Sequence, residues 1–115
     1  MAESVNEGAE LDRKIAVVVG WNPPDYAGYT VDPKKGIVRF PSMDIEDAFA
    51  AAGNHLMDLT CTGGHHEMAW RCRWLAEQPG ETDVTAYAST PALAICRAII
   101  LAEEARRKNA HEANC

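Results

Sequence analysis

The sequence predicts an α+β fold in which an antiparallel sheet of three or more strands packs with three helices in layers. Apolar residues recur at helical spacing in three separate segments of the chain. Between the last two of these segments, alternating stretches surround a Gly-Gly pair, which is a strong signal for a hairpin turn. With 115 residues, 47% of them apolar, the chain has the length and composition of one globular domain.

The first helix is expected from Ala9 to Val19. Its apolar side chains repeat at helical spacing: Leu11, Ile15, Val18 and Val19. The alternative is a strand from Ile15 to Val19, because β-branched residues dominate that stretch. We favour the helix, since the apolar stripe already begins at Leu11 among good helix formers. Residues 1–8 are polar, and we expect them to be disordered.

Two short strands are expected next, at Tyr29–Val31 and Ile37–Phe40. The linker between them, residues 32–36, has a proline early and a glycine late, which suits a hairpin turn. An ordered loop is the alternative for this stretch.

The second helix is expected to begin after Ser42, whose hydroxyl is a good N-cap. Acidic residues favour the positive end of a helix, and three follow here: Asp44, Glu46 and Asp47. The buried stripe of this helix is expected to contain Ile45, Ala48, Phe49 and Ala52. Gly53 is expected to end it.

The middle of the chain is expected to form a hairpin of two strands, Leu56–Cys61 and His66–Trp74, around the glycines at 63 and 64. Alternation gives one apolar face, which contains Met57, Leu59, Met68, Trp70, Cys72 and Trp74. The other face is polar and contains Asp58, Thr60, Glu67, Arg71 and Arg73. We expect the apolar face to meet the core.

A two-residue turn at the Gly-Gly pair also predicts the register of this hairpin. It places Cys61 opposite His66 and, further along, Cys72 opposite His55. A disulfide between Cys61 and Cys72 is therefore disfavoured.

The last part of the chain is expected to form a third strand, from Val84 to Ala88, and a long helix. Thr90 offers a hydroxyl that caps the first free N–H groups of that helix, and Pro91 suits its first position. Residues 106–115 are polar and are expected to form a solvated tail, so that the domain covers residues 9–105.

Composition excludes several classes of function. The net charge of −6 argues against a binder of nucleic acid or of anionic membranes, because both need clustered positive charge. No apolar run approaches the roughly 20 residues of a membrane span. The first residues lack the basic and apolar parts of a secretory signal, so we expect a cytoplasmic protein with reduced cysteines.

No pattern in the sequence indicates a metal site, a cofactor or a catalytic centre. Zinc ligands usually come in closely spaced pairs, and the candidates here do not: Cys61, His65, His66 and Cys72. The sequence contains no nucleophile elbow, no zinc-protease motif and no glycine-rich phosphate loop before a helix. We therefore expect a protein that is not an enzyme.

Arg97 is the strongest candidate for a functional residue. Its helical neighbours are all apolar: Leu93, Ala94, Ile100 and Leu101. Nothing in its own helix pairs with the guanidinium, so an acid or an anion from elsewhere is expected. Arg71 and Arg73 add two guanidinium groups, whose planar donors match phosphate oxygens in pairs.

Aromatic residues near these arginines are candidates for stacking on a base. Tyr87 lies on the more polar face of its strand, and Trp70 lies on the face assigned to the core. The alternative is structural: Arg71 pairs with Asp58 across the hairpin, and Arg97 pairs with Glu104 or a distant acid.

Three segments of the chain resemble the phage ABA-sandwich domain family of small phage-encoded proteins. Members open with a helix like ELDRKIAVVVGW (here Glu10–Trp21) and continue with a helix like the one at Ser42–Phe49. They close with a helix of the form T-P-x-A-I-C-R-A, which corresponds to Thr90–Ala98.

The best understood proteins that look like this family are phage inhibitors of the Thoeris defence system. They bind a cyclic ADP-ribose-type signal and sequester it without cleaving it, as oligomers. In those proteins an arginine of the last helix contacts phosphate, and Arg97 occupies the matching position. An aromatic residue of the central sheet packs on the ligand, and Trp70 is the counterpart here.

The leading hypothesis is therefore a phage or prophage protein of the host cytoplasm that binds a small phosphorylated signalling nucleotide as a homo-oligomer. Arg97, Arg71 and Arg73 would hold phosphate, with Trp70 or Tyr87 on the base. The alternative is a non-enzymatic accessory protein that acts through protein contacts, with the sheet face or the proline-rich loop as its docking surface.

Overall fold

The computed structural model describes residues 2–21, 30–53, 55–63, 68–79 and 81–113. Within them the element order is α1 (Ala2–Val19), β1 (Thr30–Asp32), β2 (Ile37–Arg39), α2 (Ile45–Ala52), β3 (Met57–Cys61), β4 (Trp70–Trp74), β5 (Val84–Ala88) and α3 (Pro91–Ala113). Strands β3, β4 and β5 form an antiparallel sheet in that order, and β1 pairs with β2 separately. The predicted α+β class, with its antiparallel sheet and three helices, is confirmed.

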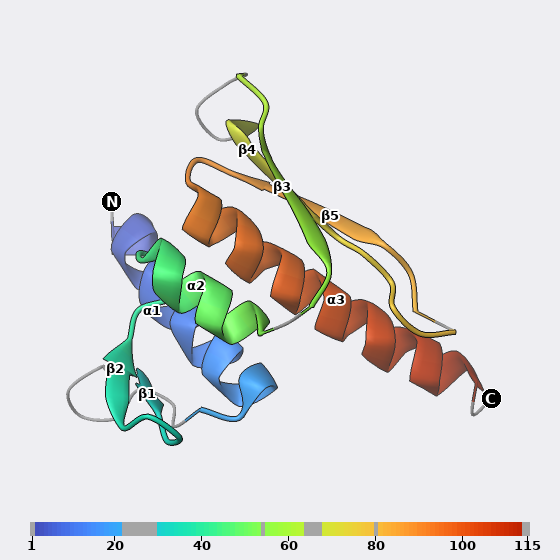
Figure 1. The fold of residues 1–115 in the computed structure, drawn as a ribbon, viewed down its shortest axis with the longest axis horizontal. Helices are drawn as coiled ribbons and strands as arrows, with labels where there is room; N and C mark the ends of the chain where they lie inside the picture. Colours follow the sequence, from blue (N-terminus) through green and yellow to red (C-terminus); the bar gives the residue numbers. More distant parts are fainter. Residues whose placement is uncertain (1, 22–29, 54, 64–67, 80, 114–115) are drawn as a thin grey trace.

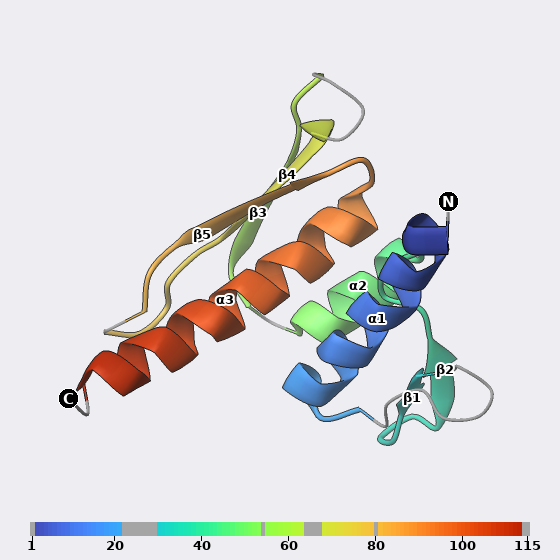
Figure 2. The ribbon, with the colours of Figure 1, turned by 180° about the vertical axis from the view of Figure 1, so that it is seen from behind.

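Helix α3 is the middle layer of the molecule. It packs on the three-stranded sheet with one side and on α1 and α2 with the other (Figure 1). The reverse view shows the same order, with α1 and α2 on the side of α3 away from the sheet (Figure 2). The chain thus places its last element at the centre, where it contacts both halves of the fold.

Small side chains build much of the core. The buried alanines come from α1, α2, β5 and α3: Ala16, Ala48, Ala51, Ala52, Ala86, Ala88, Ala92, Ala94 and Ala98. Ile15 and Ile95 are the largest aliphatic residues that are fully buried. Because alanine adds little bulk, α3 lies close to both of its neighbouring layers, and packing of such a core tolerates little change in volume.

The alternation predicted for the central hairpin gives the correct faces. Met57, Leu59, Trp70 and Trp74 pack against the core, and Cys72 is buried in it. The opposite face, here called the open face, carries Asp58, Thr60, Arg71, Arg73, Thr85 and Tyr87. Among the described helices, α3 is the one packed on this sheet, and it covers the other face.

The predicted register of the hairpin is wrong. Cys61 pairs with Trp70 and Leu59 pairs with Cys72, so the strands do not turn at a two-residue Gly-Gly loop. Strand β4 begins at Trp70 rather than His66, and residues 62–69 connect the strands. Since the shift is an even number of residues, the side chains of the paired strands stay on their predicted faces. Met68 is an exception, because it lies in the connection and is 48% exposed instead of facing the core. Cys61 and Cys72 are both free thiols.

Helix α2 begins at a different cap from the one predicted. Asp44, not Ser42, is the N-cap, and its carboxylate accepts the N–H groups of Glu46 and Asp47. The backbone N–H of Ser42 instead donates to the carboxylate of Asp12, 2.8 Å away. Phe49 is also exposed rather than buried, because the inward side of this short helix is formed by alanines.

The other predicted elements are present, with shifted ends. The helix expected from Ala9 begins at Ala2, so the helix and not the alternative strand is confirmed. The β1–β2 hairpin exists, and Gly36 closes its turn with a φ of +67° and an N–H bonded to the carbonyl of Asp32. At the start of α3, the hydroxyl of Thr90 accepts the N–H of Leu93, as predicted.

Candidate ligand-binding site

The open face of the sheet places two arginines side by side on its central strand. Arg71 lies between Thr60 of β3 and Tyr87 of β5, and Arg73 lies between Asp58 and Thr85. Cross-strand neighbours of this kind are close enough for their side chains to interact. The register therefore surrounds each arginine with polar groups from both neighbouring strands.

The two arginines differ in how their charges are satisfied. Arg73 forms an ion pair with Asp58 at 4.0 Å, and both side chains are about half exposed. Arg71 is partly buried, and its Nε is fully shielded from solvent without a hydrogen-bond acceptor among the described residues. The pairing of Arg71 with Asp58 considered from the sequence is thus made by Arg73 instead, because of the corrected register. A buried donor without an acceptor costs free energy, so the environment of Arg71 is less favourable than that of Arg73.

Arg97 has a hydrogen-bond acceptor outside its own helix. Its Nη1 donates to the backbone carbonyl of Tyr87, 2.8 Å away on β5. Strand β5 is at the edge of the sheet, so this bond satisfies a main-chain acceptor that an edge strand leaves exposed.

A hollow of about 320 Å³ lies beside Arg97, between the edge of β5, α3 and α1. It is lined by two cations, Lys14 and Arg97, by apolar residues of both helices and by three successive residues of β5, among them Tyr87. Lys14 is a site residue that the sequence did not reveal, because one lysine on a helix surface has no distinguishing pattern.

The structure divides the predicted site residues into three groups. Arg71, Arg73 and Tyr87 lie together on the open face. Arg97 lies at the edge of β5, where it binds the backbone carbonyl of the same Tyr87. Trp70 lies on the opposite face and packs against the core, so it does not share a surface with the arginines of the sheet.

The two buried cysteines are poor nucleophiles in this fold. Burial raises the pKa of the Cys72 thiol to about 11, and burial also raises the pKa of Cys96 strongly. A thiol held in its protonated form is unreactive at neutral pH.

The residues considered as a metal site are dispersed or not described. Cys61 is exposed and Cys72 is buried, whereas His65 and His66 lie outside the described residues. Among the residues that are described, no group of three or more His, Cys, Asp or Glu side chains is arranged to hold a metal ion. None of the described helices combines the length and apolar character needed to cross a membrane.

These observations define a small α+β protein whose antiparallel sheet has one helix-covered face and one polar face with arginines. No protein-family model and no curated protein matches the sequence. Among solved structures, the fold is similar to that of a phage protein from Bacillus cereus ATCC 14579. The match covers 84% of this chain and 87% of that one, with a TM-score of 0.64 and 16% sequence identity.

Proposed function

We propose that this chain is a small phage-encoded protein that binds and sequesters a small phosphorylated nucleotide at the open face and the adjoining edge of β5. The observation that carries the proposal is Arg71, a partly exposed cation on the central strand of the open face, directly opposite Tyr87. The planar guanidinium binds phosphate through paired donors.

The neighbours of Arg71 complete a site of the right chemistry. Arg73 lies two residues along the same strand and adds a second cation, and Tyr87 lies directly opposite Arg71 with 39% of its surface exposed. An exposed aromatic ring beside a phosphate site suits a base, which stacks on it. Arg97 and Lys14 extend the positive charge around the edge of β5 into the hollow.

Two likenesses support the phage assignment: the T-P-x-A-I-C-R-A helix of the ABA-sandwich family and the fold of the Bacillus cereus phage protein. We further propose that binding occurs without chemical conversion, in the host cytoplasm, and in a homo-oligomer. Preorganised donors are sufficient for sequestration, so such a site needs no catalytic group.

The test is a thermal-shift titration with cyclic ADP-ribose isomers and cyclic dinucleotides. We expect the wild type to be stabilised by at least one of them, because a ligand that binds the native state raises its melting temperature. Arg71→Gln should lose most of this shift. Arg107→Gln is the matched control, because its side chain is 69% exposed on α3 and its ion pair is with Glu103, which is not part of the open face.

Circular dichroism of each variant verifies that the fold persists. Chromatography of the ligand released from the complex tests the absence of chemistry, and we expect the compound to be recovered unchanged. If the wild type ignores every nucleotide, or if Arg71→Gln binds as well as the wild type, the proposed function is wrong.

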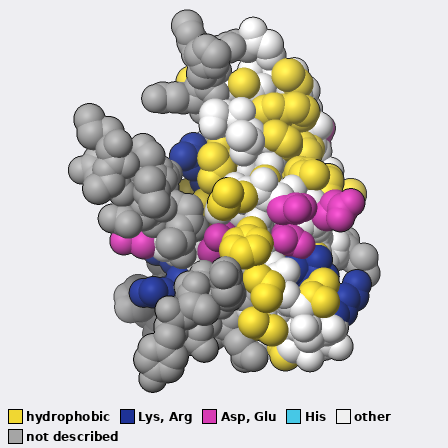
Figure 3. All heavy atoms as spheres, turned by 90° about the vertical axis from the view of Figure 1, so that its left-hand side faces the viewer, with side chains coloured by type: hydrophobic (Ala, Val, Ile, Leu, Met, Phe, Trp, Pro, Cys, Tyr) yellow, Lys and Arg dark blue, Asp and Glu magenta, His cyan; other side chains and the backbone are white. Residues whose placement is uncertain are grey.

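The second candidate function is docking of another protein, and two observations favour it. The hollow along the edge of β5 is lined by apolar side chains of Leu11, Ile100 and Leu101, which suits an apolar segment of a partner protein. Apolar side chains also gather beside acidic ones on the face where α2 begins (Figure 3). There, Met43 is 81% exposed. Retention of a partner by the wild type, with no response to nucleotides, would favour this function.

A further inference from the structure

A second hollow lies at the other end of the sheet, between the C-terminal half of α3 and the segment that follows β4. Its volume is about 320 Å³, and its lining includes Trp74, His55, Glu81 and Arg106, with Ala102 and Ala105 as its floor on α3. An adjoining hollow of about 210 Å³ shares His55, Trp74, Glu81 and Arg106. No residue of the open-face site lines either hollow, so the two places are separate.

The aromatic side of this hollow is held rigidly. The rings of His55 and Trp74 stack in parallel, with centroids 4.0 Å apart and an angle of 11° between their planes. The Nε2 of His55 lies 2.8 Å from the carbonyl of Leu75, and its Nδ1 lies 2.9 Å from the carboxylate of Glu77. These contacts hold the ring from two sides. The stacked rings of His55 and Trp74 are here called the His55–Trp74 platform. Because the contacts of His55 already fix it, the platform loses little conformational freedom when a flat group packs against it.

Opposite charges line the same hollow. Glu81 is held by the N–H groups of Glu77 and Gln78, which donate to one of its oxygens at 3.0 and 2.9 Å. These bonds, aided by the positive charges of His55 and Arg106, lower the pKa of Glu81 and keep it ionised.

Arg106 reaches the hollow from α3. Its guanidinium pairs with Glu103 through Nη2, and no ion pair joins it to Glu81 within the described part of the chain. A guanidinium has five N–H donors, so one ion pair leaves others for a ligand. The hollow therefore has a carboxylate and a guanidinium in its lining, together with an apolar floor and a flat platform.

We propose that this hollow binds a free α-amino acid with a flat, apolar side chain. Its carboxylate pairs with Arg106, its ammonium group pairs with Glu81, and its side chain packs against the His55–Trp74 platform over Ala102 and Ala105. A zwitterion matches both charges at once, whereas a ligand with a single charge matches only one of them. This inference is independent of the nucleotide site.

The test compares three probes of one shape by isothermal titration calorimetry. They are L-phenylalanine, phenethylamine (which lacks the carboxylate) and 3-phenylpropionate (which lacks the ammonium group). We expect phenylalanine to bind most tightly and each analogue to be weaker by about tenfold, the contribution of one charge-assisted hydrogen bond.

Two variants test which residue binds which charged group of the ligand. In Arg106→Gln, phenylalanine should weaken to the level of phenethylamine, whose own affinity should not fall. In Glu81→Gln, phenylalanine should weaken to the level of phenylpropionate, while the amide oxygen still accepts the N–H groups of Glu77 and Gln78. Arg13→Gln and Glu104→Gln make the same charge changes at exposed positions outside the lining and should bind like the wild type.

Three results would overturn the proposal. The first is that the wild type does not bind phenylalanine. The second is that it binds phenylalanine no more tightly than it binds phenethylamine and phenylpropionate. The third is an affinity that is unchanged in both Arg106→Gln and Glu81→Gln. Circular dichroism of each variant separates loss of the site from loss of the fold.

Discussion

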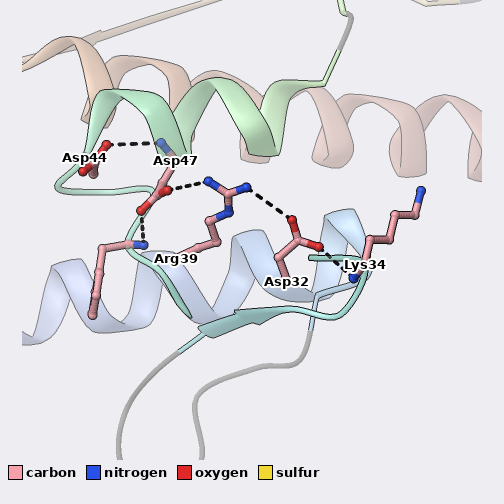
Figure 4. Close-up of polar contacts among 6 residues, drawn as sticks. Asp32, Lys34, Arg39, Asp44 and Asp47 are labelled. Carbon is pink, nitrogen blue, oxygen red and sulfur yellow. Dashed lines mark hydrogen bonds and ion pairs between the residues drawn. The ribbon is translucent and has the colours of Figure 1, made fainter. Parts of the chain in front are cut away.

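The carboxylate of Asp47 joins strand β2 to helix α2 through two bonds to adjacent residues. One oxygen accepts a hydrogen bond from Nη1 of Arg39 at 2.8 Å, and the other accepts the backbone N–H of Phe40, also at 2.8 Å. The same guanidinium lies 3.4 Å from Asp32, so Arg39 lies between carboxylates of β1 and α2 (Figure 4). The Cζ atom of Arg39 lies 5.8 Å from the centroid of the Trp21 ring, which is a cation–π distance. This cluster attaches the small hairpin to the helical layer.

Removing Asp47 should therefore destabilise the protein substantially. The side chain of Arg39 is only 10% exposed, so Asp47→Ala leaves a mostly buried charge with one weaker partner. We expect a loss of about 3 kcal/mol in the free energy of unfolding, measured by urea denaturation. Glu46→Ala, an exposed neighbour on the same helical turn, should change it by about 0.5 kcal/mol or less. Equal effects of the two substitutions would contradict the structural role of the cluster.

Asp12 should make stability depend on pH. Burial raises its pKa above the ordinary value of 3.8, despite the hydrogen bonds from Ser42 that lower it. The folded protein thus favours the protonated form of Asp12. The stability that this preference contributes is fully present below pH 3.8 and is lost as pH rises through the raised pKa. Asp12→Asn stays neutral and still accepts the N–H of Ser42. Urea denaturation should show this variant gaining stability relative to the wild type as pH rises; a constant difference would refute the assignment.

The cap at Thr90 should contribute measurably to the stability of α3. Its hydroxyl lies 3.2 Å from the N–H of Leu93, and Thr90→Ala leaves that donor to solvent. We expect a loss of about 1 kcal/mol, seen as a lower midpoint in thermal unfolding. Ser89→Ala, at the preceding exposed position, is the control and should have little effect. If both variants unfold at the wild-type temperature, the cap is not important.

The cysteines should differ strongly in their rate of alkylation. Cys61 is exposed on β3, whereas burial raises the pKa of Cys72 and Cys96 and excludes reagent from both. In a Cys115→Ser background, iodoacetamide should modify Cys61 in the folded protein and the other two only after unfolding. Peptide mapping by mass spectrometry identifies the modified residue. Modification of Cys96 as fast as Cys61 would show that α3 does not bury this thiol.

The alternation of the central hairpin predicted which side chains face the core but not how the strands pair. Periodicity of two residues determines only whether a side chain points inward or outward, so every even shift of register satisfies it equally. The Gly-Gly pair favoured a tight turn, yet Cys61 pairs with Trp70 beyond a longer connection. The choice among even registers depends on tertiary packing, which a local pattern does not contain.

The sequence drew attention to Arg97 and Arg71, but it did not predict the partners that the structure shows for them. Arg97 stood out because its helical neighbours are apolar, but the carbonyl of Tyr87 lies on a different element, ten residues away. The sequence offered Asp58 as a structural partner for Arg71, but the true register gives Asp58 to Arg73. The hollow at Arg106 had no signal at all, because its residues come together only when α3 packs beside the segment that follows β4.

The position of α3 between the two other layers has a consequence for how the chain is made. During synthesis, α1 and α2 leave the ribosome first, and the layer on which they pack is the last to emerge. Until residues beyond Pro91 are available, Ile15 and Ala48 have no α3 to cover them. The nascent chain therefore completes this fold only after α3 has been synthesised, and a product truncated before this helix should aggregate instead of folding.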